Sequence, residues 1–144
     1  MTNNENNSNE IEFGVISQYL KDASFENPQA PSIFNENLKP NIDIGFDIKA
    51  RNLSEDQHEV ALQIKVQSEQ DSKIIFLLDI TYAGLFKISN NFESKKEYIT
   101  LVECPKFLFP YARQIVSEMI KDGGYPPLMI DPVDFDRLYK NKYK

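Results

Sequence analysis

The chain has 144 residues, of which 41% are hydrophobic, and this content furnishes one core rather than two independent domains. Lysine and arginine number 16 against 22 acidic residues, and the net charge of −6 disfavours a nucleic-acid-binding protein. One cysteine excludes an internal disulfide and, with one histidine, disfavours a structural zinc site, so a reducing compartment fits best. No apolar run approaches the roughly 20 residues of a membrane-spanning helix, so we expect no membrane insertion.

Residues 1–10 differ in composition from the rest of the chain. They are rich in asparagine, acidic and poor in apolar residues, which indicates a disordered lead-in rather than a secretory signal. No segment recurs with the period of about 20 to 50 residues that marks solenoids and propellers. We therefore expect one folded domain over residues 11–140, followed by a short basic tail at 141–144.

Four segments have the two-residue hydrophobic period that is typical of β-strands. The first begins at Ile11 and extends to about Leu20, and the other three cover residues 41–49, 60–66 and 73–88. Residues 25–34 contain two prolines between aromatic residues, so the sequence predicts an extended connection there that lies on an apolar surface.

The final third of the chain changes to a helical period. A broad apolar stripe over residues 107–121 predicts a long helix, with Pro110 in its first turn and the adjacent glycines at 123–124 just after its end. Residues 93–102 predict a short irregular helix. Four strands in meander order followed by helices indicate an α+β fold, a four-stranded antiparallel sheet with two helices packed on one face.

The clearest candidates for chemistry have structural interpretations. Asp131 is the expected N-cap of a short final helix whose first residue is Pro132, and the neighbouring Asp134 and Asp136 are typical of a first turn. These carboxylates are therefore not an acid–base pair.

His58 lies among polar residues and is expected to be solvated, and Cys104 is expected in the core. The sequence has no Walker loop, no GxGxxG and no HExxH motif. We expect no catalytic residue, no cofactor and no metal.

The remaining signal is a surplus of aromatic and apolar residues, which either completes an ordinary core or forms binding surfaces. The long helix has a stripe wide enough to serve a second surface as well as the sheet.

Three segments carry a resemblance to a known family. They are KDASFENPQAP at residues 21–31, CPKFLFPYAR at 104–113 and PVDFD at 132–136. In this order, and with the same strand and helix spacing, the chain resembles the SecB-type protein-export chaperones from about Phe13 to Tyr139.

This resemblance implies a cytoplasmic homotetramer, a dimer of dimers, that holds precursor proteins unfolded without ATP and delivers them to the translocase motor ATPase SecA. The long helix would then lie between two sheets of the assembly. The positions that match the tetramer interface are Leu78, Ile80, Tyr82, Ile115 and Met119.

The resemblance also implies two binding surfaces. Unfolded clients would occupy an aromatic groove between residues 25–40 and the last helix, and SecA would bind an acidic outer surface through a tail that carries its own zinc. The positions that match the client groove are Phe25, Phe34, Leu38, Ile42, Ile44, Phe46, Phe135 and Leu138. The positions that match the SecA surface are Asp22, Glu26, Leu77 and Asp79.

Two departures from the family pattern concern these surfaces. Leu38 stands where relatives often have tryptophan, and residues 137–144 are basic where many relatives have an acidic tail. Two other functions remain open at this point: a SecB-like chaperone dedicated to one partner such as an antitoxin, and a small-molecule-binding domain.

Overall fold

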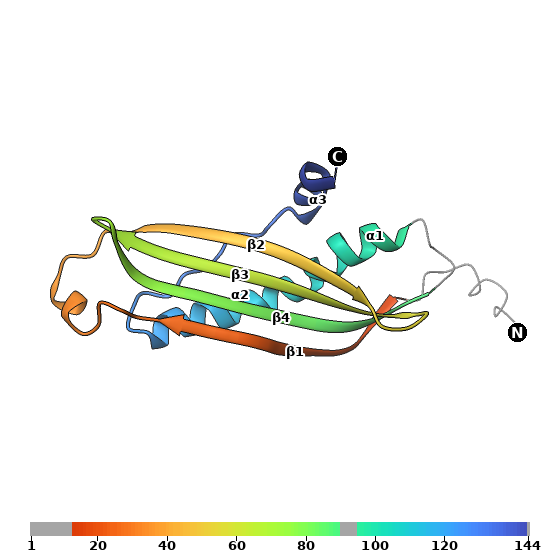
Figure 1. The fold of residues 1–144 in the computed structure, drawn as a ribbon, viewed down its shortest axis with the longest axis horizontal. Helices are drawn as coiled ribbons and strands as arrows, with labels where there is room; N and C mark the ends of the chain where they lie inside the picture. The colour runs from red at the N-terminus through yellow and green to blue at the C-terminus, as the bar shows by residue number, and fades with distance from the viewer. Residues whose placement is uncertain (1–12, 90–94, 144) are drawn as a thin grey trace, which may run out of the picture.

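A computed structural model describes residues 13–89 and 95–143 of the chain, so the lead-in predicted at 1–10 lies outside the described residues. Four strands form one antiparallel sheet: β1 (Phe13–Glu26), β2 (Asn41–Asn52), β3 (Gln57–Gln70) and β4 (Lys73–Ile88). The long helix α2 (Cys104–Asp122) runs along one face of this sheet, called here the inner face (Figure 1). The predicted α+β class, with a four-stranded antiparallel sheet and two helices, is confirmed.

The alternating hydrophobic pattern of each strand determines which face it buries. Val60, Leu62 and Ile64 of β3 are fully buried on the inner face, and Ile64 lies opposite Ile80 of β4. The alternate positions of β3, on the outer face, include the polar residues Glu59, Gln63 and Lys65. The core also contains the α2 side chains that face β3 and β4, which are Leu108, Ala112, Val116 and Ile120.

The strand order differs from the predicted meander. The order in the sheet is β1-β4-β3-β2, a Greek-key arrangement in which only β2, β3 and β4 follow one another as hairpins. Residues 27–40, which connect β1 to β2, contain three prolines and are too long for a tight hairpin. The β1 strand therefore lies against β4 at the far edge of the sheet, where Phe25 stacks on Phe76 with ring centroids 5.4 Å apart.

The connection after β1 is less extended than predicted. Phe25 belongs to β1, which continues to Glu26, and a short 3-10 helix, η2 (Ser32–Asn35), interrupts the connection. The reason is packing: Ile33 is buried in the core, and a helical turn points its side chain inward.

The predicted irregular helix is confirmed for the described residues, with 93–94 outside them. It consists of α1 (Lys96–Tyr98) and a π-helical turn, η4 (Ile99–Glu103). Because η4 continues directly into α2, that helix starts at Cys104, earlier than expected. The first-turn proline is consequently Pro105, and Pro110 lies inside the helix.

The last helix, α3 (Phe135–Tyr143), also starts elsewhere than predicted. Its cap is Asp134, whose Oδ1 accepts a hydrogen bond of 3.1 Å from the backbone N–H of Arg137. The predicted cap Asp131 precedes a non-helical segment, because the first residue that the core buries here is Phe135. Residues 141–143 of the predicted tail continue α3.

Two single residues complete the comparison. His58 is buried rather than solvated, because it has the same alternation as Val60 and Leu62 and therefore faces inward. Cys104 is fully buried, as predicted.

Candidate functional site

The β2 strand forms one edge of the sheet (Figure 1). It carries a row of apolar side chains on the inner face. The row consists of Ile42, Ile44, Phe46 and Ile48, which lie opposite Ser68, Val66, Ile64 and Leu62 of β3. None of the four is fully buried, and Ile42 is 39% exposed. The chain therefore leaves an apolar strip along a free sheet edge, called here the β2 strip.

A cleft of about 270 Å³ opens beside the strip where α3 faces β2. Its lining residues are Phe46, Asp47, Ile48, Leu101, Leu138, Tyr139 and Asn141. Phe135 lies beneath the cleft, buried against Phe109, whose ring in turn contacts Phe46 at 6.3 Å between centroids. Of the residues predicted for a client site, Phe46 and Leu138 thus line the cleft, and Phe135 supports it.

A second aromatic cluster lies at the other end of the sheet. Phe34 packs on Tyr125 with centroids 5.4 Å apart, and Tyr125 packs on Phe76 at 5.0 Å. The close approach of Phe34 requires glycine at 124, where an added Cβ would lie 2.8 Å from the ring and φ is +100°. Phe34 is 45% exposed, so this cluster is also open to a ligand.

The predicted client residues therefore lie in two places joined by the β2 strip, rather than in one cleft. Phe25 and Phe34 belong to the Tyr125 cluster, and Leu38 is half-buried against the core. Sequence reasoning missed Ile48, although its alternation with Phe46 would have included it. It also missed Leu101, because nothing in the irregular η4 turn indicates which side faces β2.

On the outer face, three of the four residues predicted for SecA binding, Glu26, Leu77 and Asp79, line one depression, and Asp22 lies further along β1. Glu26 pairs with Leu77, Ser24 with Asp79, and Asp22 with Thr81, at alternate positions of β1 and β4. Gln63 donates a hydrogen bond of 3.0 Å to the Asp79 carboxylate. A shallow depression of about 500 Å³ contains Glu26, Leu77 and Asp79, together with Asp43 and Lys65 of the neighbouring strands. We call this group of residues the acidic surface.

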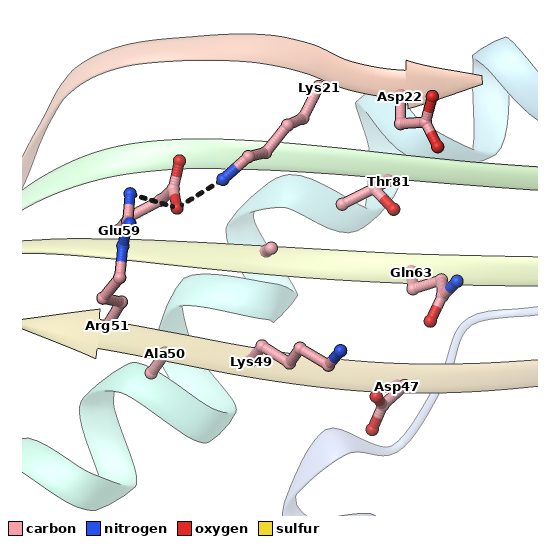
Figure 2. Close-up of a pocket in the computed structure, with 10 residues that line it drawn as sticks. Lys21, Asp22, Asp47, Lys49, Ala50, Arg51, Glu59, Gln63 and Thr81 are labelled. Atoms are coloured by element: carbon pink, nitrogen blue, oxygen red, sulfur yellow. Dashed lines mark hydrogen bonds and ion pairs between the residues drawn. The ribbon is translucent and has the colours of Figure 1, made fainter.

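Further along the outer face, three strands converge on one buried carboxylate (Figure 2). Glu59 accepts hydrogen bonds from Lys21 Nζ at 2.8 Å, from Tyr19 Oη at 2.5 Å and from Arg51 at 3.3 Å. The Lys21 hydrogen bond, followed by that of Tyr19, holds the pKa of Glu59 below its ordinary value. Burial, with the nearby Glu59 carboxylate, raises the pKa of Tyr19 to about 12. The carboxylate is thus held by three donors from β1 and β2, which indicates a structural role.

A last apolar surface lies where β1 meets α2. Five exposed large side chains form it: Phe13, Val15, Leu20, Phe107 and Tyr111. Leu20 and Tyr111 are each 46% exposed. Aromatic contacts connect the surface to the core: Phe107 lies edge-on to Phe86, and Tyr111 stacks on Tyr82. We call it the β1/α2 patch.

Of the residues predicted for the tetramer interface, Tyr82 contacts the β1/α2 patch, because its ring stacks on that of Tyr111. Ile115 and Met119 of α2 are half-buried, whereas Leu78, Ile80 and Tyr82 are already buried under α2 within the single chain.

The described residues offer little for catalysis. Residues 13–89 and 95–143 contain no group of three His, Cys, Asp or Glu side chains that could hold a metal ion. Burial raises the pKa of the Cys104 thiol far above its ordinary value, so its reactive thiolate form is suppressed. In the same residues, no helix combines the length and apolar character needed to cross a membrane.

Comparisons with known proteins agree with this description. The family model described as preprotein translocase subunit SecB matches residues 5–144. The chain belongs to the SecB family. Protein-export protein SecB of Maricaulis maris is 42% identical over 127 residues, which cover 88% of this chain and 74% of the relative. Protein-export protein SecB of Bradyrhizobium diazoefficiens is 43% identical over 130 residues, covering 90% and 81%.

A solved structure shares the SecB fold. It is the Mycobacterium tuberculosis Rv1957 SecB-like chaperone in complex with a ChAD peptide from the Rv1956 HigA1 antitoxin. Its TM-score to this chain is 0.70 at 15% identity, covering 84% of this chain and 90% of that one. SecB is a family of protein-export chaperones and not of enzymes, and the predicted family and fold are confirmed.

Proposed function

We propose that this SecB-family chain is an ATP-independent chaperone that holds precursor proteins unfolded in the cytoplasm and delivers them to SecA. The observation that carries the proposal is the β2 strip, with an open cleft at one end and an exposed aromatic cluster at the other. An unfolded client presents apolar side chains without a fixed shape. Each contact contributes only about 25 cal/mol per Å² buried, so a long surface with many weak contacts suits it.

The holding activity is tested by adding the protein, without nucleotide, to an unfolded precursor that aggregates or refolds. We expect both processes to slow at equimolar protein. The Leu138→Asp variant, which places a charge at the cleft, should bind the precursor several-fold more weakly. Leu53→Asp is the matched control, because Leu53 is similarly exposed but lies in the turn after β2. Absence of any delay with several precursors would reject the proposal.

For SecA we propose the acidic surface as the contact. Leu77 is half-buried beside Asp79 and Glu26, a combination that suits a basic partner segment with some apolar character. Reversing Asp22, Glu26 or Asp79 to Lys should weaken binding of the basic tail peptide of SecA and leave precursor binding intact. Asp122→Lys is the control, because Asp122 ends α2 on the opposite face. Calorimetry that gives one affinity for all variants would reject this site.

We further propose a homotetramer, because a single chain leaves the β1/α2 patch exposed. Monomeric proteins seldom expose so many large apolar residues side by side, and a second copy would cover them. Ile115 and Met119 would contribute directly. Leu78, Ile80 and Tyr82 would contribute by supporting α2 from below.

A chaperone dedicated to one antitoxin is the alternative. Relatives at 42–43% identity are named for protein export, whereas the likeness to Rv1957 concerns the fold alone. Affinity capture from cells separates the two, since many precursors support export and a single small antitoxin supports the alternative.

A further inference from the structure

The β1 strand changes its alternation at Lys21. Leu20 lies opposite Tyr82, whose side chain is buried on the inner face. Asp22 lies opposite Thr81, the neighbouring residue of β4, which lines a depression of the outer face. Two residues of β1 therefore span one step of β4, and Lys21 is the extra residue of a β-bulge.

The bulge determines which face receives the acidic side chains of β1. Beyond it, Asp22 and Glu26 face outward, and Glu26 lies opposite Leu77. Before it, Tyr19 faces outward, where its hydroxyl donates a hydrogen bond to Glu59. A shift of one residue moves every later side chain of a strand to the other face. Without the bulge, the alternation that starts at Tyr19 would direct Asp22 and Glu26 to the inner face.

A salt bridge holds the extra residue in place. Lys21 Nζ lies 2.8 Å from Glu59 Oε1, and the Glu59 side chain is 10% exposed whereas that of Lys21 is 46% exposed. Glu59 is fixed in turn by hydrogen bonds from Tyr19 and Arg51. Lys21 and Asp22 are adjacent and border one depression of about 670 Å³ (Figure 2). Whatever anchors Lys21 therefore also anchors the backbone that carries Asp22.

The Asp22 side chain has no anchor of its own. It is exposed, and its carboxylate forms no hydrogen bond or ion pair with the residues that the structure describes. Asp79 differs, because its carboxylate accepts a hydrogen bond of 3.0 Å from Gln63. The orientation of Asp22 thus depends on the bulge more than that of Asp79 does.

We propose that Glu59 is a positioning residue for SecA binding, because its salt bridge with Lys21 holds the bulge that presents Asp22 on the outer face. This inference rests on the proposed SecA contact and adds a residue that acts without touching the partner. Lys21 has the same positioning role at the other end of the salt bridge. A cation beside an acidic binding surface opposes the binding of a basic segment, so electrostatic complementarity gives no reason for a lysine there.

The Lys21→Met variant separates positioning from charge, because the two effects have opposite signs. Methionine keeps an unbranched side chain but cannot form the salt bridge. Loss of a positive charge beside Asp22 should by itself strengthen binding of the zinc-loaded basic tail peptide of SecA. If Lys21 positions Asp22, calorimetry should instead give an affinity weaker by about two- to fivefold, the contribution of one exposed charged contact.

Two further variants serve as matched controls. Lys49→Met removes a cation from the same depression, but Lys49 is exposed and forms no ion pair with the described residues. Its affinity for the tail peptide should stay the same or rise. Lys21→Arg preserves the charge and can still pair with Glu59, so it should bind as the wild type does. If Lys49→Met weakens binding as much as Lys21→Met does, the proposal is wrong.

Double variants identify the residue through which Glu59 acts. Glu59→Gln should weaken binding of the tail peptide in the wild type and in an Asp79→Asn background. It should have no effect in an Asp22→Asn background, where the positioned carboxylate is already missing. A general loss of stability would instead reduce the affinity alike in both backgrounds, and that result would overturn the proposal.

The single variant Asp22→Asn distinguishes failure of this inference from failure of the proposed SecA contact. If Asp22→Asn binds the tail peptide as tightly as the wild type does, Asp22 is not a contact and both proposals fail at this residue. If Asp22→Asn binds more weakly while Lys21→Met binds as tightly as the wild type or more tightly, the SecA contact stands and only this inference fails.

Discussion

Glu59 shows how one buried charge connects three strands. Its carboxylate, on β3, accepts hydrogen bonds from Lys21 of β1, across the intervening β4, and from Arg51 of β2 (Figure 2). Tyr19 of β1 donates a third hydrogen bond. Lys21 is the extra residue at a register shift between Leu20 and Asp22, and a bulge of this kind redirects a side chain. The bulge in β1 therefore has a structural reason: it brings the Lys21 ammonium to Glu59.

We predict that Glu59→Gln lowers the free energy of unfolding by about 1 to 2 kcal/mol, because Lys21 and Arg51 lose a charged acceptor but remain partly solvated. Urea unfolding at neutral pH measures this. Glu118→Gln is the control, since its pairing with Lys121 is exposed and should contribute at most about 0.5 kcal/mol. Equal losses in both variants would contradict the special role of Glu59.

The same residue predicts a pH dependence. Because the pKa of Glu59 is lower in the folded protein than in the unfolded chain, the unfolded chain binds more protons in acid. The stability from Glu59 is fully present above the ordinary pKa of about 4.5 and is lost as the pH falls through the lower folded pKa. The difference in stability between the wild type and Glu59→Gln should therefore shrink on acidification, as unfolding curves across acidic pH will show.

At the scale of elements, the contact between α2 and the sheet depends on a glycine. A Cβ added at Gly84 of β4 would lie 2.6 Å from the ring of Phe86 and 3.1 Å from the Leu108 side chain of α2. Phe86 and Leu108 are both fully buried and have no space into which to move.

Gly84→Ala should therefore destabilise the protein by about 1 to 3 kcal/mol through overpacking. Gly45→Ala is the matched control, because Gly45 is also in a strand but has no atom within 4 Å of an added Cβ. Its stability should stay the same or rise slightly, as the unfolded chain loses freedom. Denaturant unfolding measures the free energy of unfolding of both variants. If Gly84→Ala leaves this free energy unchanged, α2 can shift to make room for the added Cβ.

Sequence patterns predicted the elements well where burial follows a local period, as in β4, whose predicted and observed bounds agree. The predicted first residues of the helices were wrong, because more than one residue near each start could be the first-turn proline or the cap. Pro105 and Pro110 both suit a first turn, and Asp131 and Asp134 both suit a cap, and packing chose between them. Strand order failed for a non-local reason, since the pairing of β1 with β4 is absent from any local pattern.

The residues of the candidate sites were also easier to predict on regular strands than on connections and short helices. Alternation and family resemblance together brought Glu26, Leu77 and Asp79 to one surface, because these residues lie on regular strands. The client residues were harder to place, because they come from a connection and a short helix whose positions depend on tertiary contacts such as Phe34 on Tyr125.

At the scale of the whole molecule, the two edges of the sheet have different surroundings. The β1 edge adjoins the exposed patch that we assign to assembly, whereas the β2 edge adjoins the cleft that we assign to clients. Assembly and client binding can therefore proceed at opposite edges without competing.

We predict that Leu20→Asp dissociates the proposed tetramer of 16.7 kDa chains, because assembly would bury a carboxylate in the β1/α2 patch. Ile42→Asp is the matched control: Ile42 is a similarly exposed residue on the inner face of the other edge strand. It should remain tetrameric and lose client affinity instead. Light scattering of both variants tests this, and a wild type that is a stable monomer would exclude the assembly.

The strand order also has a consequence for folding during translation. Phe13 pairs with Ile88, so β1 leaves the ribosome long before its partner exists, whereas the hairpins of β2, β3 and β4 close over short stretches. During that interval β1 is an apolar segment of the nascent chain without its partner strand. Under the proposed holding function, this segment of a newly translated chain is itself a candidate client of completed copies.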